Sequence, residues 1–193
     1  MPPLGRKPRL RVVPVTAERW DDMVTLFERR GPRGGYRNVP AYGCWCMYWR
    51  DRSIPHGEGK KRAMEELVCA GREPGLLAYG DGEPVGWVSL GPRQDFPALL
   101  RSPQYRPREE GGGDAVWSLV CFAVDKDAQR HGVARELLAA AVAHAFARGA
   151  SSLEAYPHKT EGTNYMGHVG LFETAGFTPV RETSKRVIMR IEP

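Results

Sequence analysis

The chain has 193 residues, with 28 Lys and Arg against 23 Asp and Glu, which gives a net charge of +5. Domains usually run about 100 to 200 residues, so this length favours one compact domain and leaves little room for a second core. The longest apolar runs are interrupted by polar residues and are shorter than the ~20 residues that span a bilayer, so we do not expect a membrane protein.

The N-terminal part of the chain begins with a predicted strand and helix. Residues 9–15 alternate like a strand, and Pro14 restricts that strand to the edge of a sheet. Apolar residues then recur at helical spacing between Trp20 and Phe27, which predicts a helix. Residues 31–59 show neither period and are predicted to be irregular.

A second helix, a hairpin and a long loop are predicted next. The helix covers residues 63–71, and the apolar runs Leu76–Tyr79 and Val85–Leu90 flank the sequence GDGEP, a hairpin pattern. Residues 91–114 are rich in Pro, Arg and Gly, which indicates a long flexible loop between strands. Loops of this length are usually functional or disordered.

The C-terminal half contains the strongest patterns. Residues 115–124 are almost continuously apolar, as in a strand covered on both faces. A clear helical stripe follows over residues 134–149, ending at a glycine. A strand at residues 151–156, a short helix ending near residue 176 and a last strand at residues 187–191 complete the prediction.

Cysteine usage and charge bear on where the protein works and what it binds. Residues 1–11 lack the apolar segment of a secretory signal, and the four cysteines form no evident disulfide framework. We therefore expect reduced thiols and a cytoplasmic location. The excess positive charge is compatible with nucleic-acid binding, with an anionic small molecule, or with solubility alone.

A glycine motif lies between the buried strand and the long helix, in the sequence DKDAQRHGVARELL. There, Gln129-x-x-Gly132-x-Ala134 opens the helix. Free N–H groups at a helix N-terminus, with the positive end of the helix dipole, can bind phosphate oxygens. Short glycine motifs also occur by chance, so an ordinary strand–turn–helix connection is the alternative. Three basic residues here add charge that suits a polyphosphate: Arg130, His131 and Arg135.

This motif resembles the acetyl-CoA signature of the GCN5-related N-acetyltransferase (GNAT) family, (Gln/Arg)-x-x-Gly-x-(Gly/Ala), and matches it at each position. The order of predicted elements is also similar to that family's, and LFETAGFTPV at 171–180 is similar to one of its later segments. The resemblance covers nearly the whole chain. It implies an α/β fold in which residues 1–193 form a single domain with a mixed central β-sheet flanked by helices. The cofactor-binding core would cover about residues 115–177, and the loops of residues 1–114 would bind the acceptor.

The resemblance implies acetyl-CoA, or another short acyl-CoA, as co-substrate. The pyrophosphate would bind backbone amides of residues 130–135, and the pantetheine arm would pair with Phe122 and Val124 like an added strand. A backbone N–H near Phe122 would stabilise the developing oxyanion. The implied cofactor-binding residues are Phe122, Ala123, Val124, Gln129, Arg130, His131, Gly132, Val133, Ala134 and Arg135.

The catalytic groups are less regular than the cofactor motif. Acetyl transfer to an amine needs a base, and Glu154 is our candidate because a carboxylate in an otherwise apolar strand beside the cleft is suited to accept a proton. Strand alternation could equally place Glu154 on a solvated face, and Asp114 is another candidate. The family's usual acid tyrosine falls at Phe172, which has no hydroxyl. Tyr165 is the substitute candidate if the following helix extends back to it, and a packing tyrosine is the alternative.

A cysteine–aromatic segment, YGCWCMYWR at 42–50, adds a further candidate site. Cys44-x-Cys46 lacks the C-x-x-C spacing of zinc sites and has no partner pair nearby, so no metal is predicted. The segment is interpreted either as an aromatic wall of the acceptor pocket or as a packed cluster.

The sequence therefore predicts an enzyme that transfers an acetyl or short acyl group from acyl-CoA directly to a primary amine. A non-catalytic acyl-CoA-binding module is the competing prediction, because Phe172 lacks the acid. The basic residues at 29–37 would attract acyl-CoA or an acidic acceptor, or only solvate a loop, and nucleic-acid binding is not expected. The acceptor is not specified, and a homodimer stays open.

Overall fold

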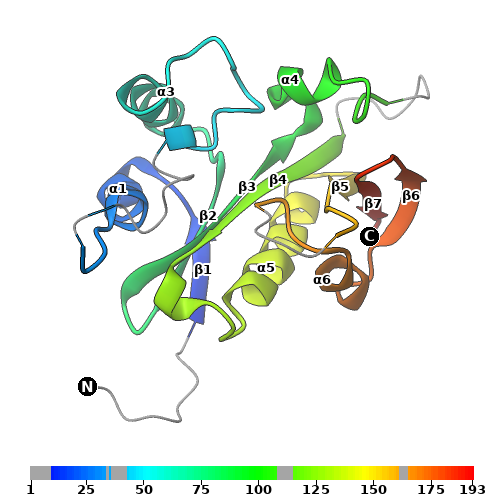
Figure 1. The fold of residues 1–193 in the computed structure, drawn as a ribbon. Coiled ribbons are helices and arrows are strands. Elements are labelled where there is room, and N and C mark those ends of the chain that lie inside the picture. Colours follow the sequence, from blue (N-terminus) through cyan, green and yellow to red (C-terminus); the bar gives the residue numbers. More distant parts are fainter. Residues whose placement is uncertain (1–9, 34, 36–42, 108–114, 161–164) are drawn as a thin grey trace.

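The computed structural model describes residues 10–33, 35, 43–107, 115–160 and 165–193. Within these residues the chain forms one seven-stranded sheet in the order β1-β2-β3-β4-β5-β7-β6 (Figure 1). Neighbouring strands are antiparallel except β4 and β5, which are parallel. The predicted mixed sheet with flanking helices is therefore confirmed.

The elements follow the predicted order. The strands are β1 (Leu10–Pro14), β2 (Gly75–Gly80), β3 (Glu83–Pro92), β4 (Val116–Val124), β5 (Ser152–Ala155), β6 (Thr178–Glu182) and β7 (Val187–Ile191). The α-helices are α1 (Trp20–Glu28), α3 (Glu58–Cys69), α4 (Pro97–Leu100), α5 (Val133–Ala147) and α6 (Val169–Thr174). Short 3-10 turns precede α1, α4 and α5: η1 (Ala17–Arg19), η2 (Arg93–Asp95) and η3 (Lys126–Ala128).

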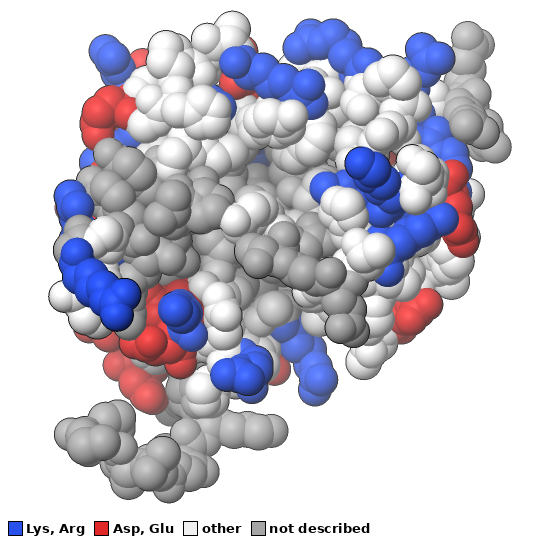
Figure 2. Space-filling view, viewed as in Figure 1, with Lys and Arg blue, Asp and Glu red and all other residues white. Residues whose placement is uncertain are grey.

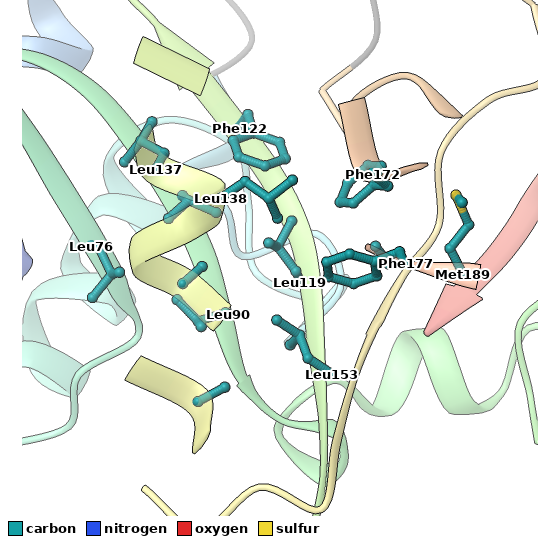
Figure 3. Close-up of a cluster of buried hydrophobic side chains, with 14 of the residues drawn as sticks. Leu76, Leu90, Leu119, Phe122, Leu137, Leu138, Leu153, Phe172, Phe177 and Met189 are labelled. Carbon is teal, nitrogen blue, oxygen red and sulfur yellow. The ribbon is translucent and has the colours of Figure 1, made fainter. Parts of the chain in front are cut away.

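Helices cover both faces of the sheet. Helices α5 and α6 pack on one face, where their apolar residues join the sheet in a cluster that includes Leu119, Leu137 and Phe172 (Figure 3). Helices α1 and α3 cover the other face around Trp45 and Trp87 (Figure 1). Full burial of one such large apolar side chain stabilises a fold by about 1.5–3 kcal/mol, so the two clusters fix both layers against the sheet.

A glycine on β3 sets how closely α5 approaches the sheet. A Cβ at Gly86 would lie 2.7 Å from the Val133 side chain and 3.0 Å from that of Leu137. The first turns of α5 therefore rest directly on the backbone of β3. Because β3 pairs with β4, this contact places the N-terminus of α5 beside the C-terminal end of β4.

The prediction of a flexible loop over residues 91–114 is wrong for its first half. Helix α4 forms there, and Phe96 and Leu99 are fully buried. Pro97 stands in the first turn of α4, where its fixed φ suits a helix start and its missing N–H costs nothing. The sequence did not predict this helix because its two buried apolar residues stand among many Pro, Arg and Gly, which are typical of loops. Residues 108–114, with the candidate base Asp114, lie outside the described residues.

Charge is distributed over the surface. Figure 2 shows Lys and Arg side chains in several separate groups on this face, with Asp and Glu between some of them. One of the arginines that the sequence placed in a basic stretch, Arg29, is paired with Asp125 and Glu83. In the described part of the chain, no helix has the length and apolarity needed to cross a membrane.

Candidate functional site

Strands β4 and β5 part halfway along β4. Their parallel pairing covers only Val116–Leu119 against β5, whereas β4 continues to Val124 (Figure 1). Beyond Leu119, the edge of β4 that faces β5 has no strand partner in the described residues. One of its groups, the N–H of Phe122, donates to the backbone carbonyl of Tyr165 at 2.5 Å. This edge can pair with an extended, amide-bearing molecule.

A β-bulge lies where the two strands part. In the pairing with β3, Ser89 opposes Cys121 and Leu90 opposes Leu119, so Val120 is the additional residue in β4. Bulges bend a strand and increase its twist. Val120 and Cys121 consequently both contact clusters on the face away from α5, while Phe122 packs on the α5 face. The bulge thus turns the end of β4 away from β5.

The connection from β4 to α5 is anchored by a buried carboxylate. Asp125 is 2% exposed, and its Oδ1 accepts from the N–H of Asp127 at 3.0 Å, which caps η3. Its Oδ2 accepts from Arg29 at 3.3 Å. Sequence reasoning missed this pair, although an Asp directly after a strand and two residues before a free N–H is a capping signal. The pair fixes the start of the connection to the helix.

The backbone of the connection forms a concave turn at the N-terminus of α5. Arg130 has φ 63° and Gly132, the N-cap of α5, has φ 88°. Successive backbone N–H groups in a turn that contains left-handed residues can point toward one anion and so make an anion-binding concavity. The first N–H groups of α5, from Val133 to Arg135, have no partner within the helix, and the helix dipole adds partial positive charge there. A Cβ at Gly132 would meet nothing within 4 Å, so space exists for a ligand.

The side chains of this connection leave the concavity accessible. The Nε2 of Gln129 donates to the backbone carbonyl of Val124 at 3.3 Å. The Nδ1 of His131 lies 2.8 Å from the backbone carbonyl oxygen of Gln129. Arg130, His131 and Arg135 are exposed. A polyphosphate at this turn would therefore meet backbone N–H groups first and flexible cations around them.

The comparisons with known proteins agree with this geometry. Residues 41–177 match the model of the acetyltransferase (GNAT) family. The chain belongs to the GNAT family. This match covers more than half of the chain and includes the whole of β4, the turn and α5. No curated sequence is significantly similar to the chain.

Solved structures of this GNAT fold are similar over almost the whole chain. An N-acetyltransferase from Staphylococcus aureus Mu50 has a TM-score of 0.59 at 15% identity, covering 95% of this chain and 98% of its own. The yncA acetyltransferase from Salmonella typhimurium, solved with acetyl-CoA, has a TM-score of 0.56 at 14% identity, with 95% and 93% covered. The PaiA N-acetyltransferase from Thermoplasma acidophilum, solved with coenzyme A, has a TM-score of 0.54 at 12% identity, with 95% and 99% covered. At these identities the likeness shows the fold alone.

The predicted base, Glu154, lies in a buried ion-pair network. Its side chain is 7% exposed, so the alternative of a solvated face is wrong. Oε1 accepts from Arg190 at 2.8 Å and Oε2 from Arg93 at 3.4 Å. Oε2 also accepts from the Tyr156 hydroxyl at 3.1 Å, and that hydroxyl is 2.8 Å from the Ser118 hydroxyl on β4. Burial and the Glu154 charge raise the pKa of Tyr156 well above its ordinary value, so this phenol stays neutral. The network connects Glu154 to β4.

The two aromatic positions considered for the acid have opposite environments. Phe172 is fully buried and packs between Phe122 and Phe177, with ring centroids 6.2 and 5.2 Å away. Tyr165 is 41% exposed, and burial of its ring raises the pKa of its hydroxyl, with Cys121 as a second cause. Helix α6 begins only at Val169, so the condition that this helix extends back to Tyr165 is not met, and Tyr165 stands in the segment before it. Gly167, with φ 80°, ends the intervening segment against Phe172.

The cysteine–aromatic segment divides into a buried and a surface part. Trp45, Cys46 and Met47 are buried in the α1–α3 cluster, while Tyr48 is 41% exposed. The rings of Tyr48 and Trp49 pack edge to face with their centroids 4.8 Å apart. The guanidinium of Arg52 lies over both rings. The interpretation as a packed cluster is thus confirmed for Trp45, Cys46 and Met47, whereas an aromatic wall of the acceptor pocket stays a prediction for Tyr48 and Trp49. Among the residues that the structure describes, no group of three or more His, Cys, Asp and Glu is placed to hold a metal ion.

Proposed function

We propose that this GNAT protein transfers an acetyl group, or another short acyl group, from acyl-CoA to a primary amine by direct attack, without an acyl-enzyme. One observation carries the proposal: the turn at Arg130–Gly132 follows directly on the end of β4, whose edge toward β5 has no strand partner beyond Leu119 in the described residues. The turn suits a pyrophosphate and the edge suits an amide-bearing arm. Coenzyme A contains both groups in this order.

Two hydrogen bonds inside the protein bear on how acyl-CoA would bind. The N–H of Phe122 is held by the carbonyl of Tyr165, and the carbonyl of Val124 by the side chain of Gln129. These are the backbone groups proposed to pair with the pantetheine arm. Binding would exchange each internal bond for one to the ligand, so the edge of β4 is satisfied in both states. Ala123 contributes to the opposite face, against the α1–α3 cluster.

The direct mechanism requires a proton to leave the amine before it attacks the thioester carbonyl. Glu154 is the proposed base, and the hydrogen bonds from Glu154 through Tyr156 to Ser118 offer a route from β4. Glu154→Gln keeps the shape of the network and removes the charge. We expect at least a tenfold loss of kcat and a changed pH–rate profile. The control is Glu182→Gln, an exposed carboxylate on β6. An unchanged profile in Glu154→Gln would refute the role.

Tyr165 is the proposed acid that protonates the departing thiolate. Its raised pKa keeps the hydroxyl protonated at neutral and mildly alkaline pH. Tyr165→Phe leaves the backbone bond to Phe122 in place and removes only the hydroxyl. A thiol pKa near 8.5 makes the thiolate a tolerable leaving group, so we expect a loss of about three- to tenfold in kcat. Tyr79→Phe is the control, because it also removes a phenol hydroxyl but from β2, where that hydroxyl donates to Asp22.

The whole proposal is tested by binding followed by turnover. Thermal unfolding with coenzyme A and with acetyl-CoA measures binding, and thiol release over a panel of amines measures transfer. We expect both. Binding without release on any amine would instead support a non-catalytic acyl-CoA-binding module, and absence of binding would refute both functions.

We place the cofactor-binding core at about residues 115–177 and the acceptor-binding loops within residues 1–114. We also propose a cytoplasmic protein, since Cys44, Cys46, Cys69 and Cys121 are all free thiols. A homodimer stays an open proposal that sedimentation would decide.

A further inference from the structure

Two cysteines from distant segments pack together where the cysteine–aromatic segment contacts β4. Cys46 is 3% exposed and lies in the cluster under α1 and α3, against which the half-buried Cys121, the residue directly before Phe122, also packs. The indole Nε1 of Trp87 donates to the Cys46 sulfur at 3.2 Å. The acetyl-transfer mechanism proposed above uses neither thiol.

The sheet register explains why these groups converge. On β3 and β4, Trp87 opposes Ala123, and Ser89 opposes Cys121. Trp87, Ala123 and Cys121 all belong to or pack against the cluster under α1 and α3. The bulge at Val120 puts Cys121 on this face instead of the α5 face. Cys46, held by the Trp87 N–H, therefore lies over the same part of the sheet as Cys121.

The backbone around Cys46 is unusual. Trp45 and Cys46 have φ of 46° and 52°, the left-handed region that residues other than glycine rarely adopt. Such conformations cost about 1–3 kcal/mol each and persist only where the surroundings hold them. Trp45 supplies that hold, because it is fully buried with its ring 5.6 Å from Trp20 and 4.9 Å from Phe27. The strained turn keeps the Cys46 sulfur against β4.

We propose that Cys46 and Cys121 are a modification site that forms a reversible disulfide with a peroxide as oxidant. Cys121 is the more accessible of the two, so its thiolate attacks the peroxide, the O–O bond breaks, and hydroxide leaves with a sulfenic acid on Cys121. The Cys46 sulfur then attacks the Cys121 sulfur, the S–O bond breaks, and water leaves with the Cys46 proton. Two electrons pass from the two thiols to the peroxide. A small thiol reverses the bond by exchange.

Disulfide sulfurs are about 2.05 Å apart, so Cys46 and Cys121, which pack in the same cluster, must bring their sulfur atoms to that distance. The bond joins the cysteine–aromatic segment to β4 directly beside Phe122. If the proposed function holds, it ties the acceptor side of the cleft to the cofactor strand, and we expect at least a fivefold loss of transfer that a reductant restores.

Peptide mapping of the full-length protein tests the site without relying on activity. The reduced chain is treated with stoichiometric hydrogen peroxide, alkylated, digested with trypsin without reduction, and analysed by mass spectrometry. We expect tryptic peptide 38–50 linked to peptide 109–126. Because peptide 38–50 contains both Cys44 and Cys46, Cys44→Ser should keep the link and Cys46→Ser should lose it. Cys69→Ser, an exposed cysteine on α3, is the matched control and should keep it.

A second test does not depend on whether Cys46→Ser folds. The double variant Cys44→Ser with Cys69→Ser retains Cys46 and Cys121 as its only cysteines, and a disulfide within its monomer supports the proposal. A bond between Cys44 and Cys46 in the native chain, or thiols oxidised to sulfinic acid without any link, would overturn it. A link that forms while transfer on an active preparation stays unchanged would overturn the control of activity. Absence of any transfer before oxidation would count against the proposed function alone.

Discussion

The two ends of helix α5 are built in opposite ways. At the C-terminal end, Arg148 pairs with Glu73, and the Nε2 of His144 is 3.6 Å from the same carboxylate. At the N-terminal end, Gly132 is the N-cap and no side-chain hydrogen bond caps the helix within the described residues. Arg130 and Arg135 are exposed there.

The difference indicates which end is available to a ligand. A cation near a helix C-terminus is favourable to the dipole, and the chain supplies one itself. The same chain supplies no acidic cap for the N-terminus and instead bends its backbone N–H groups toward an accessible space. Glu136 stands in the first turn, but the end that the protein leaves without a side-chain cap is the end proposed to bind the pyrophosphate.

The largest effect is expected from the carboxylate under the N-terminal end. Asp125→Asn keeps an oxygen for the cap of η3 but leaves Arg29 without its buried partner. We expect the free energy of unfolding to fall by about 2–3 kcal/mol, below the full value for a buried pair because Arg29 is 23% exposed. Chemical denaturation measures it. Glu83→Gln is the control, because Glu83 pairs with the same arginine but is 74% exposed. Equal losses in the two variants would contradict the anchoring role.

The glycines that flank α5 allow a matched test of its two ends. Gly132 and Gly149 have φ of 88° and 83°, and a Cβ at either would meet nothing within 4 Å. Replacing either with Ala should cost a similar ~1 kcal/mol of stability through the left-handed backbone. Only Gly132→Ala should weaken coenzyme A binding in calorimetry, at least tenfold, or about 1.4 kcal/mol. Equal affinities in the two variants would place the cofactor elsewhere.

The exposed arginines should contribute less than the backbone. Removing Arg135 weakens coenzyme A binding by about two- to fivefold at low salt, because exposed charge pairs are worth only about 0.2–1 kcal/mol. The difference from the unaltered protein should shrink as salt is added. Arg148→Ala, at the other end of α5, should leave the affinity unchanged. A salt-independent loss in Arg135→Ala would contradict a purely electrostatic contribution.

The smallest effect concerns pH at the C-terminal end. Burial lowers the pKa of His144, Glu73 opposes that shift and Arg148 adds to it. The folded state therefore prefers the neutral imidazole. Its contribution to stability is present above the ordinary value of about 6.5 and is lost as pH falls from there to the lowered folded pKa, at no more than about 1.4 kcal/mol per pH unit. His144→Gln should flatten thermal stability between pH 7 and 5, whereas an unchanged slope would contradict this.

How far the sequence predicts the molecule depends on what each part is made of. The proposed cofactor side is formed by backbone, so its signals are local: an apolar run for β4, Gly132 where φ is positive, and an amphipathic stripe for α5. The order and type of elements follow from the same periodicities. The sequence also shows that Phe172, which has no hydroxyl, stands where the family's usual tyrosine would be. Phe172 is fully buried, an environment that suits an apolar ring.

The proposed acceptor side depends on contacts between distant residues, which spacing does not show. The meeting of Cys46 with Cys121 requires the β3–β4 register, a bulge at Val120 and a left-handed turn at Trp45. Glu154 illustrates the same limit, because its two arginine partners come from η2 and β7. Helix α4 was missed since its anchors, Phe96 and Leu99, stand among residues typical of loops.

Hydrogen–deuterium exchange of the backbone amides, with and without coenzyme A, measures whether the cofactor binds at β4 and the start of α5. We predict slower exchange for peptides covering Phe122–Val124 and Arg130–Arg135, and unchanged exchange for the end of α5 at Arg148 and Gly149. Protection confined to other elements, or equal at both ends of α5, would contradict the proposal that the N-terminal end of this helix and the edge of β4 beyond Leu119 bind the cofactor.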